Sequence, residues 1–145
     1  MRSKRMQPVA DHAGQKEQDA VQHFAAAQRD VSDAEQQLQQ LFVYREEYAQ
    51  KLTGQLGLNI EQVRNFQAFI DKLNYAIDQS RLDIESKKQI CEQKKRVWIS
   101  CRSRSEALNL VVEKYQREEL REQDRIEQKE QDEHAQRIVN KLSDK

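Results

Sequence analysis

The sequence predicts an all-α protein, an antiparallel two-helix coiled-coil hairpin with arms of unequal length. Charged residues make up 34% of the 145 residues and the mean hydropathy is -1.05, which is too polar for a globular core of this length. Only three glycines and one proline interrupt the chain. Apolar residues recur at alternating steps of three and four residues through two long segments, which is the heptad pattern of a coiled coil.

The first helix is expected over about residues 8–52. Pro8 suits its first turn, where a missing N–H costs nothing. Nine of ten seam positions in this segment are apolar or aromatic, and Arg45 is the exception. The ten seam positions are Ala20, Phe24, Ala27, Val31, Ala34, Leu38, Leu41, Arg45, Tyr48 and Leu52.

A turn is expected over residues 53–59, centred near Gln55 and Leu56. Gly54 and Gly57 lie in this segment, and glycine adopts the positive-φ conformations that end helices and reverse a chain. Asn59, followed three residues later by Gln62, resembles a capping box, so the next helix is expected to begin at Ile60.

The second helix is expected over about residues 60–141, because no glycine or proline follows Gly57. We expect residues 1–145 to form one elongated coiled-coil unit. A turn at residues 55–56 pairs residues whose numbers sum to about 111, which places Trp98 near Ala13 and Gly14 and leaves residues beyond about Arg104 without a partner. The second seam comprises Phe66, Ile70, Leu73, Ile77, Ser80, Ile84, Lys87, Cys91, Lys94, Trp98, Cys101, Ser105, Leu108, Val112 and Tyr115.

Aromatic side chains stand beside the seam near the predicted turn. Tyr44 and Phe69 lie off the seam, and a two-stranded coiled coil buries only a narrow stripe, so both rings are expected to be partly exposed. A contiguous exposed aromatic patch usually marks an interaction site. The alternative is that both rings fold over the seam and thicken it.

Several classes of function are not indicated. Two cysteines are too few for a disulfide framework or a zinc module, and no apolar run approaches the ~20 residues that span a bilayer. The sequence contains no P-loop, no nucleophile with a base and no metal-ligand set. We therefore expect a cytoplasmic protein that is not an enzyme, needs no metal or cofactor and does not insert into the membrane.

The middle of the second helix is basic, over residues 87–104. Nucleic-acid binding is one interpretation, contact with an acidic protein is another, and solvation of a coiled-coil exterior is a third. Zero net charge and the scarcity of aromatics there argue against nucleic acid, so none is expected as a partner.

Three segments together resemble the flagellar FliJ family, namely "YREEY" at 44–48, "NFQAFIDKLNYAID" at 65–78 and "QKEQDEHAQR" at 128–137. The resemblance implies a hairpin similar to the stalk of the rotary ATPase γ subunit. It implies a component of the bacterial flagellar type III export apparatus, peripherally associated with the membrane. The implied partners are the hexameric export ATPase, which it would regulate, the export-gate membrane protein and the export chaperones.

The resemblance also implies two binding sites. The gate-contact surface comprises Gln37, Leu41, Tyr44, Tyr48, Phe69, Leu73 and Ala76. The ATPase-contact surface comprises Gln128, Lys129, Asp132, Glu133, Gln136 and Arg137, joined by the line of positive charge formed by Arg117, Arg121 and Arg125. The charge line is otherwise a solvated helix face. Two other functions stay open, an export chaperone that escorts substrates and a structural coiled-coil spacer.

Overall fold

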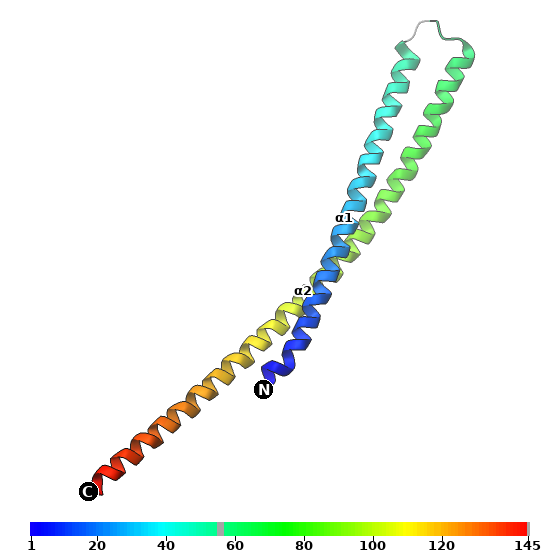
Figure 1. Ribbon diagram of the computed structural model, residues 1–145. Helices are drawn as coiled ribbons and strands as arrows, with labels where there is room; N and C mark the ends of the chain where they lie inside the picture. Colours follow the sequence, from blue (N-terminus) through cyan, green and yellow to red (C-terminus); the bar gives the residue numbers. More distant parts are fainter. Residues whose placement is uncertain (55–56, 145) are drawn as a thin grey trace. The chain divides into compact units, whose positions relative to one another are not determined.

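The structure is a computed structural model that describes residues 1–54 and 57–144, and it consists of two long helices (Figure 1). Helix α1 covers Arg2–Gly54, 53 residues, and helix α2 covers Ile60–Ser143, 84 residues. The predicted all-α helical hairpin is confirmed. Contacts divide the chain into unit 1, Met1–Gln18 with Ser100–Lys145, and unit 2, Asp19–Ile99. That residues 1–145 form one elongated unit stays a prediction.

In unit 2 the two helices pack side by side and run antiparallel. Phe24 stacks on Trp98, with ring centroids 5.7 Å apart, and Tyr48 lies 4.4 Å from Phe69. The small methyl groups of α1 let the two backbones approach closely, and branched side chains of α2 fill the space between them. The buried residues of this unit are Ala20, Ala27 and Ala34 from α1 with Leu73, Ile77 and Ile84 from α2.

The predicted heptad seam is confirmed by burial. Every predicted seam residue of α1 is buried or half-buried, and so is every one of α2 except Lys94. Lys94 is exposed, as is usual for a lysine, whose charged ammonium group favours water. Cys91 and Cys101 are half-buried free thiols at seam positions.

In unit 1 the start of α1 packs against α2. The backbone N–H of Ser3 donates to Glu119 Oε1 at 3.1 Å, and the Ser3 hydroxyl donates to Oε2 at 2.6 Å. The Arg2 guanidinium stands 5.8 Å from the centre of the Tyr115 ring. These contacts explain why α1 begins at Arg2 and not at Pro8 as predicted, because they offset the backbone hydrogen bond that a proline inside a helix removes.

The predicted pairing register is wrong. Contacting residues have numbers that sum to 122 for Phe24 with Trp98, 119 for Arg45 with Asn74 and 117 for Tyr48 with Phe69, not to about 111. Trp98 therefore lies against Phe24 instead of the predicted Ala13 and Gly14.

The error has two causes. Helix α1 ends at Gly54 and helix α2 begins at Ile60, and these two residue numbers already sum to 114 instead of 111. Helical side chains also point toward the N-terminus of their own helix. On both helices the Cα atom of a contacting residue therefore lies C-terminal to the contact itself, which raises the sum of the two residue numbers.

The same shift corrects the extent of pairing along α2. Residues beyond Arg104 are not without partners, because Ser105 and Val112 are buried and Glu119 accepts two hydrogen bonds from Ser3. Each described residue from Leu120 to Asp144 is exposed. The unpaired part of α2 is therefore shorter than expected, although the helix ends within two residues of the predicted position.

The connection between the helices follows the expected chemistry in the part that is described. Gly57 has a φ of 95°, a conformation that favours glycine. The Gln62 N–H donates to Asn59 Oδ1 at 2.7 Å, and the Asn59 N–H donates to Gln62 Oε1 at 3.1 Å. This reciprocal pair is the predicted capping box. The predicted centre of the turn, at residues 55 and 56, lies outside the described residues.

Candidate protein-binding surfaces

The residues predicted to contact the export gate come together in unit 2, and we call this set the aromatic patch: Gln37, Leu41, Tyr44, Tyr48, Phe69, Leu73 and Ala76. The Tyr44 side chain is 49% exposed and Phe69 is 39% exposed. The predicted partial exposure of both rings is confirmed, and the alternative in which both are sealed over the seam is not what the structure contains.

Tyr48 links the patch to the seam. Its ring centre lies 4.4 Å from that of Phe69 and 6.0 Å from that of Phe66, and the Lys51 ammonium stands 5.0 Å from the ring. Tilted ring pairs at these distances are attractive beyond the area they bury. The half-buried Tyr48 thus packs on Phe69 from the facing helix, while Phe69 stays partly exposed.

Leu73 is the one predicted patch residue that does not reach the surface. It is 7% exposed and belongs to the core of unit 2. A partner could touch it only if the two helices separated. Its place on a seam position means that Leu73 supports the patch from beneath, and its assignment to the gate-contact surface stays a prediction.

A shallow groove of about 640 Å³ runs beside Tyr44, between the two helices. Its walls are Gln37, Gln40, Leu41 and Tyr44 from α1 and Ala76, Gln79, Ser80 and Asp83 from α2. The sequence analysis did not predict three of these groove residues, Gln40, Gln79 and Asp83. All three lie on the same flank as Tyr44, Asp83 next to the seam and the two glutamines one position further out, so applying the heptad spacing to the flanks as well as the seam would have predicted them.

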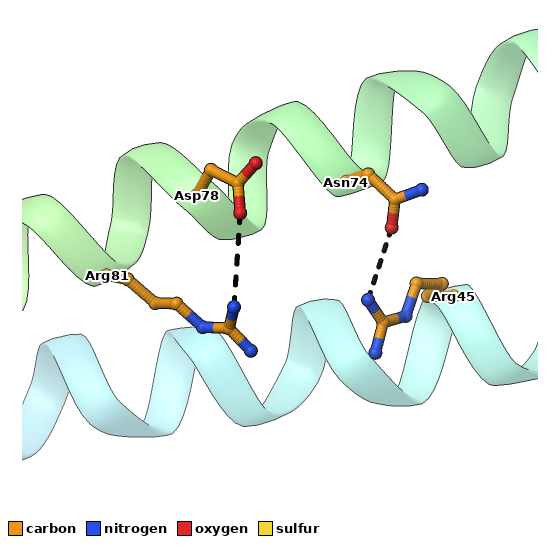
Figure 2. Close-up of polar contacts among 4 residues, drawn as sticks. All are labelled: Arg45, Asn74, Asp78 and Arg81. Atoms are coloured by element: carbon orange, nitrogen blue, oxygen red, sulfur yellow. Dashed lines mark hydrogen bonds and ion pairs between the residues drawn. The ribbon is translucent and has the colours of Figure 1, made fainter.

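The opposite flank of the seam is built differently, from cations. Two guanidinium groups lie over the Phe42 ring, that of Arg45 at 5.1 Å and that of Arg81 at 5.4 Å from the ring centre. Figure 2 shows Arg45 Nη1 donating to Asn74 Oδ1 at 3.2 Å, and Arg81 directed toward Asp78 at 3.9 Å. Arg45 therefore occupies a seam position without burying an unpaired charge, because its guanidinium group extends to the flank of the seam.

The residues predicted to contact the ATPase all lie on the α2 part of unit 1, and each is exposed: Arg117, Arg121, Arg125, Gln128, Lys129, Asp132, Glu133, Gln136 and Arg137. The interactions seen among them are local to the helix. Arg125 lies 2.6 Å from Glu122, and Gln128 Nε2 donates to Asp132 Oδ1 at 3.2 Å. The hydrogen bond from Arg125 lowers the pKa of Glu122, and the same bond raises that of Arg125.

Such exposed pairs hold the side chains loosely, because each contributes little in water. The surface can therefore exchange its internal pairs for those of a charged partner.

Among residues 1–54 and 57–144 there is no cluster of three or more potential metal ligands. Neither helix, over its described residues, has a stretch long and apolar enough to cross a bilayer.

A protein-family model described as "Flagellar FliJ protein" matches residues 2–142. The chain belongs to the FliJ family. Two Flagellar FliJ proteins are each 30% identical to it, that of Salmonella typhi over 136 residues and that of Escherichia coli (strain K12) over 133 residues. The alignments cover 92% and 90% of the chain, and the same shares of the two relatives.

The FliJ match extends over nearly the whole length of both helices and includes the aromatic patch and the exposed end of α2. The resemblance inferred from the three sequence segments is therefore confirmed at the level of the family. FliJ membership makes this a flagellar protein and supports a place in flagellar protein export.

Proposed function

We propose that the chain couples the export ATPase ring to the export gate in the flagellar type III export apparatus. In this proposal the aromatic patch binds the cytoplasmic domain of the gate, and the exposed end of α2 binds the ATPase hexamer. The chain acts by binding and not by catalysis, works in the cytoplasm beside the membrane-bound apparatus, and assists the handling of export chaperones.

The observation that carries the proposal is the exposure of Tyr44, which lines a groove between the two helices, and of Phe69, which packs on Tyr48. Aromatic side chains that are half-exposed and held by neighbours are typical anchors of protein–protein interfaces. Single exposed apolar residues are common on this chain, so the groove beside Tyr44 and the ring pair of Tyr48 with Phe69, and not exposure alone, favour a role in binding.

The exposed end of α2 supports the second contact. From Leu120 to Asp144 its described residues expose charged side chains of both signs on all faces. A slim helix of this kind fits a channel lined with repeated charges, and weak exposed pairs allow contacts to be exchanged between neighbouring ring subunits.

A binding assay with purified components tests the proposal. Tyr44→Ala is compared with Tyr75→Ala, which removes an equally large ring that is exposed elsewhere on α2. We expect Tyr44→Ala to weaken binding to the gate cytoplasmic domain about ten-fold or more, and Tyr75→Ala to leave it unchanged. Equal effects of the two substitutions would contradict the assignment of the patch.

The ATPase contact is tested in the same assay with a chain that ends at Leu120. This chain is expected to keep gate binding and lose ATPase binding, since the paired part of the hairpin is intact. Loss of chaperone binding alone, with gate and ATPase binding retained, would instead indicate an export chaperone.

A further inference from the structure

Helix α1 has a weak point at Gly14, within unit 1. Glycine inside a helix is less stable than alanine, because its backbone loses more conformational freedom on folding. Close packing does not require glycine here. A methyl group added at Gly14 would lie 3.9 Å from Ser105 Oγ, an ordinary van der Waals distance. Gly14 therefore favours opening of the helix at a position where alanine would fit.

A second weak point lies on the N-terminal side of the first, at Pro8. Proline has no N–H to donate to the carbonyl of Lys4, and its ring crowds that carbonyl, yet α1 runs through this position. A helical segment of this length is also marginal on its own in water. Residues 2–13 therefore stay helical because of their contacts with α2.

Those contacts with α2 involve small side chains. The residues of this segment that are buried are Ser3, Ala10 and Ala13, none larger than serine. Among the described residues, the hydrogen bonds that join residues 2–13 to α2 are the two from Ser3 to Glu119, at 3.1 and 2.6 Å. Burial of small side chains stabilises in proportion to the little apolar area that they remove from water. The segment is thus fixed mainly at one end, by Ser3.

The surface of α2 beneath this segment has larger side chains. Val112 is 5% exposed, and the seam residues Leu108 and Tyr115 are half-buried. Contacts in unit 1 have residue numbers that sum to 119 and 122, which places Val112 level with residues 7–10 of α1. The small side chains of α1 therefore cover a stripe of branched and aromatic side chains on α2.

We propose that residues 2–13 form a strap that opens as one unit at Gly14 and uncovers the apolar stripe of Leu108, Val112 and Tyr115. Local opening takes place where few apolar contacts hold a segment, and this segment also contains a proline that disfavours its helix. The strap thus controls access to the stripe. The device concerns unit 1 alone and does not require binding to the gate or the ATPase.

Amide hydrogen exchange of the full chain, resolved by NMR, tests whether the strap opens as a unit. The amides of residues 5–13 are expected to share one level of protection, about ten-fold or more below that of residues 20–34. Gly14→Ala is expected to slow exchange of all of them together, by about five-fold. Ser32→Ala is the matched control, because it also introduces alanine at a helical position of α1, on an exposed residue of unit 2. It is expected to change exchange of the strap by less than about two-fold.

Thiol labelling tests whether opening uncovers the stripe. Val112→Cys, in a chain that also carries Cys91→Ser and Cys101→Ser, places a single thiol beneath the strap. Labelling by a maleimide is expected to slow about five-fold with Gly14→Ala, the same factor as for exchange, and to accelerate about three-fold or more with Ser3→Ala. Ile84→Cys in the same background is the control, since Ile84 is buried in unit 2. Its labelling is expected to be unaffected by either substitution.

Two results would overturn the proposal. One is protection that rises smoothly from residue 5 to residue 20, with Gly14→Ala acting only on its immediate neighbours, because this is ordinary fraying of a helix end. The other is labelling of the thiol at position 112 that does not respond to Gly14→Ala, because the stripe would then not be uncovered by the strap. Neither measurement includes the gate or the ATPase, so failure of this proposal is distinguishable from failure of the proposed function.

Discussion

Substitution of Ile77, in the core of unit 2, tests how the two helices of this unit are held together. Ile77 is 1% exposed and is the largest side chain among the described residues that is fully buried. It lies at a seam position of α2, and contacts whose residue numbers sum to 119 and 123 place it level with residues 42–46 of α1, beside the seam residues Leu41 and Arg45. Replacing Ile77 with alanine leaves a gap in the seam.

The magnitude follows from three contributions. Ile77→Ala removes three carbon groups from a dry site, which costs about 2.4 kcal/mol at ~0.8 kcal/mol for each group. Alanine forms helix more readily than isoleucine, which returns about 0.4 kcal/mol. A cavity adds to the loss to the extent that the helices cannot close it. We expect the free energy of unfolding to fall by about 2–4 kcal/mol.

Urea unfolding followed by circular dichroism at the helical band measures this change. Leu82→Ala is the control, because it removes the same number of carbon atoms from a side chain that is 66% exposed. It is expected to change the free energy of unfolding by about 0.5 kcal/mol or less. A loss below about 1 kcal/mol for Ile77→Ala, or equal losses for the two variants, would refute the reasoning that this seam residue holds unit 2 together.

Three further outcomes are expected. Phe24→Ala should lower the free energy of unfolding by about 2 kcal/mol. It should also shift Trp98 fluorescence to longer wavelength, because the stacked ring that shields the indole is lost. An unchanged spectrum would contradict the corrected register. Hydrogen bonds from the Ser3 hydroxyl and backbone N–H lower the pKa of Glu119 below its ordinary value of 4.5, so their contribution to stability is present above that pH and is lost as the pH falls through the lowered pKa. Ser3→Ala should therefore raise the Glu119 pKa in an NMR titration, and an unmoved pKa would exclude the hydroxyl as its main cause. A chain ending at Leu120 should melt within about 3 °C of the full chain, because the removed residues are exposed; a larger drop in scanning calorimetry would indicate that they do pack.

Much of the fold could be predicted because a coiled coil is encoded locally. The heptad spacing, the absence of helix breakers and the capping box at Asn59 and Gln62 each act within a few residues of chain, and each was confirmed. The exposure of Tyr44 and Phe69 followed from the same logic, because a two-helix seam has a known narrow width. The site could be predicted to the extent that it lies at a fixed angle from the seam.

Other features depended on contacts between residues far apart in the chain. The start of α1 at Arg2 depends on the hydrogen bonds from Ser3 to Glu119, and no local sequence pattern near Pro8 predicts them. Leu73 was predicted both as a seam residue and, by the family resemblance, as part of the gate-contact surface, and packing against α1 buries it as the seam predicts.

By itself, the sequence determined the fold class, the two helices and their seam, because helical periodicity is a property of each strand alone. Only the tertiary structure decided the register between the two helices. The register fixes which rings stack, which carboxylate accepts the hydrogen bonds from Ser3 and where pairing along α2 stops. The physical reason is that sliding one helix along the other by a heptad leaves apolar residues facing apolar residues on both helices. The choice among registers is therefore made by individual side-chain contacts and by the geometry of the connection, and not by the periodicity.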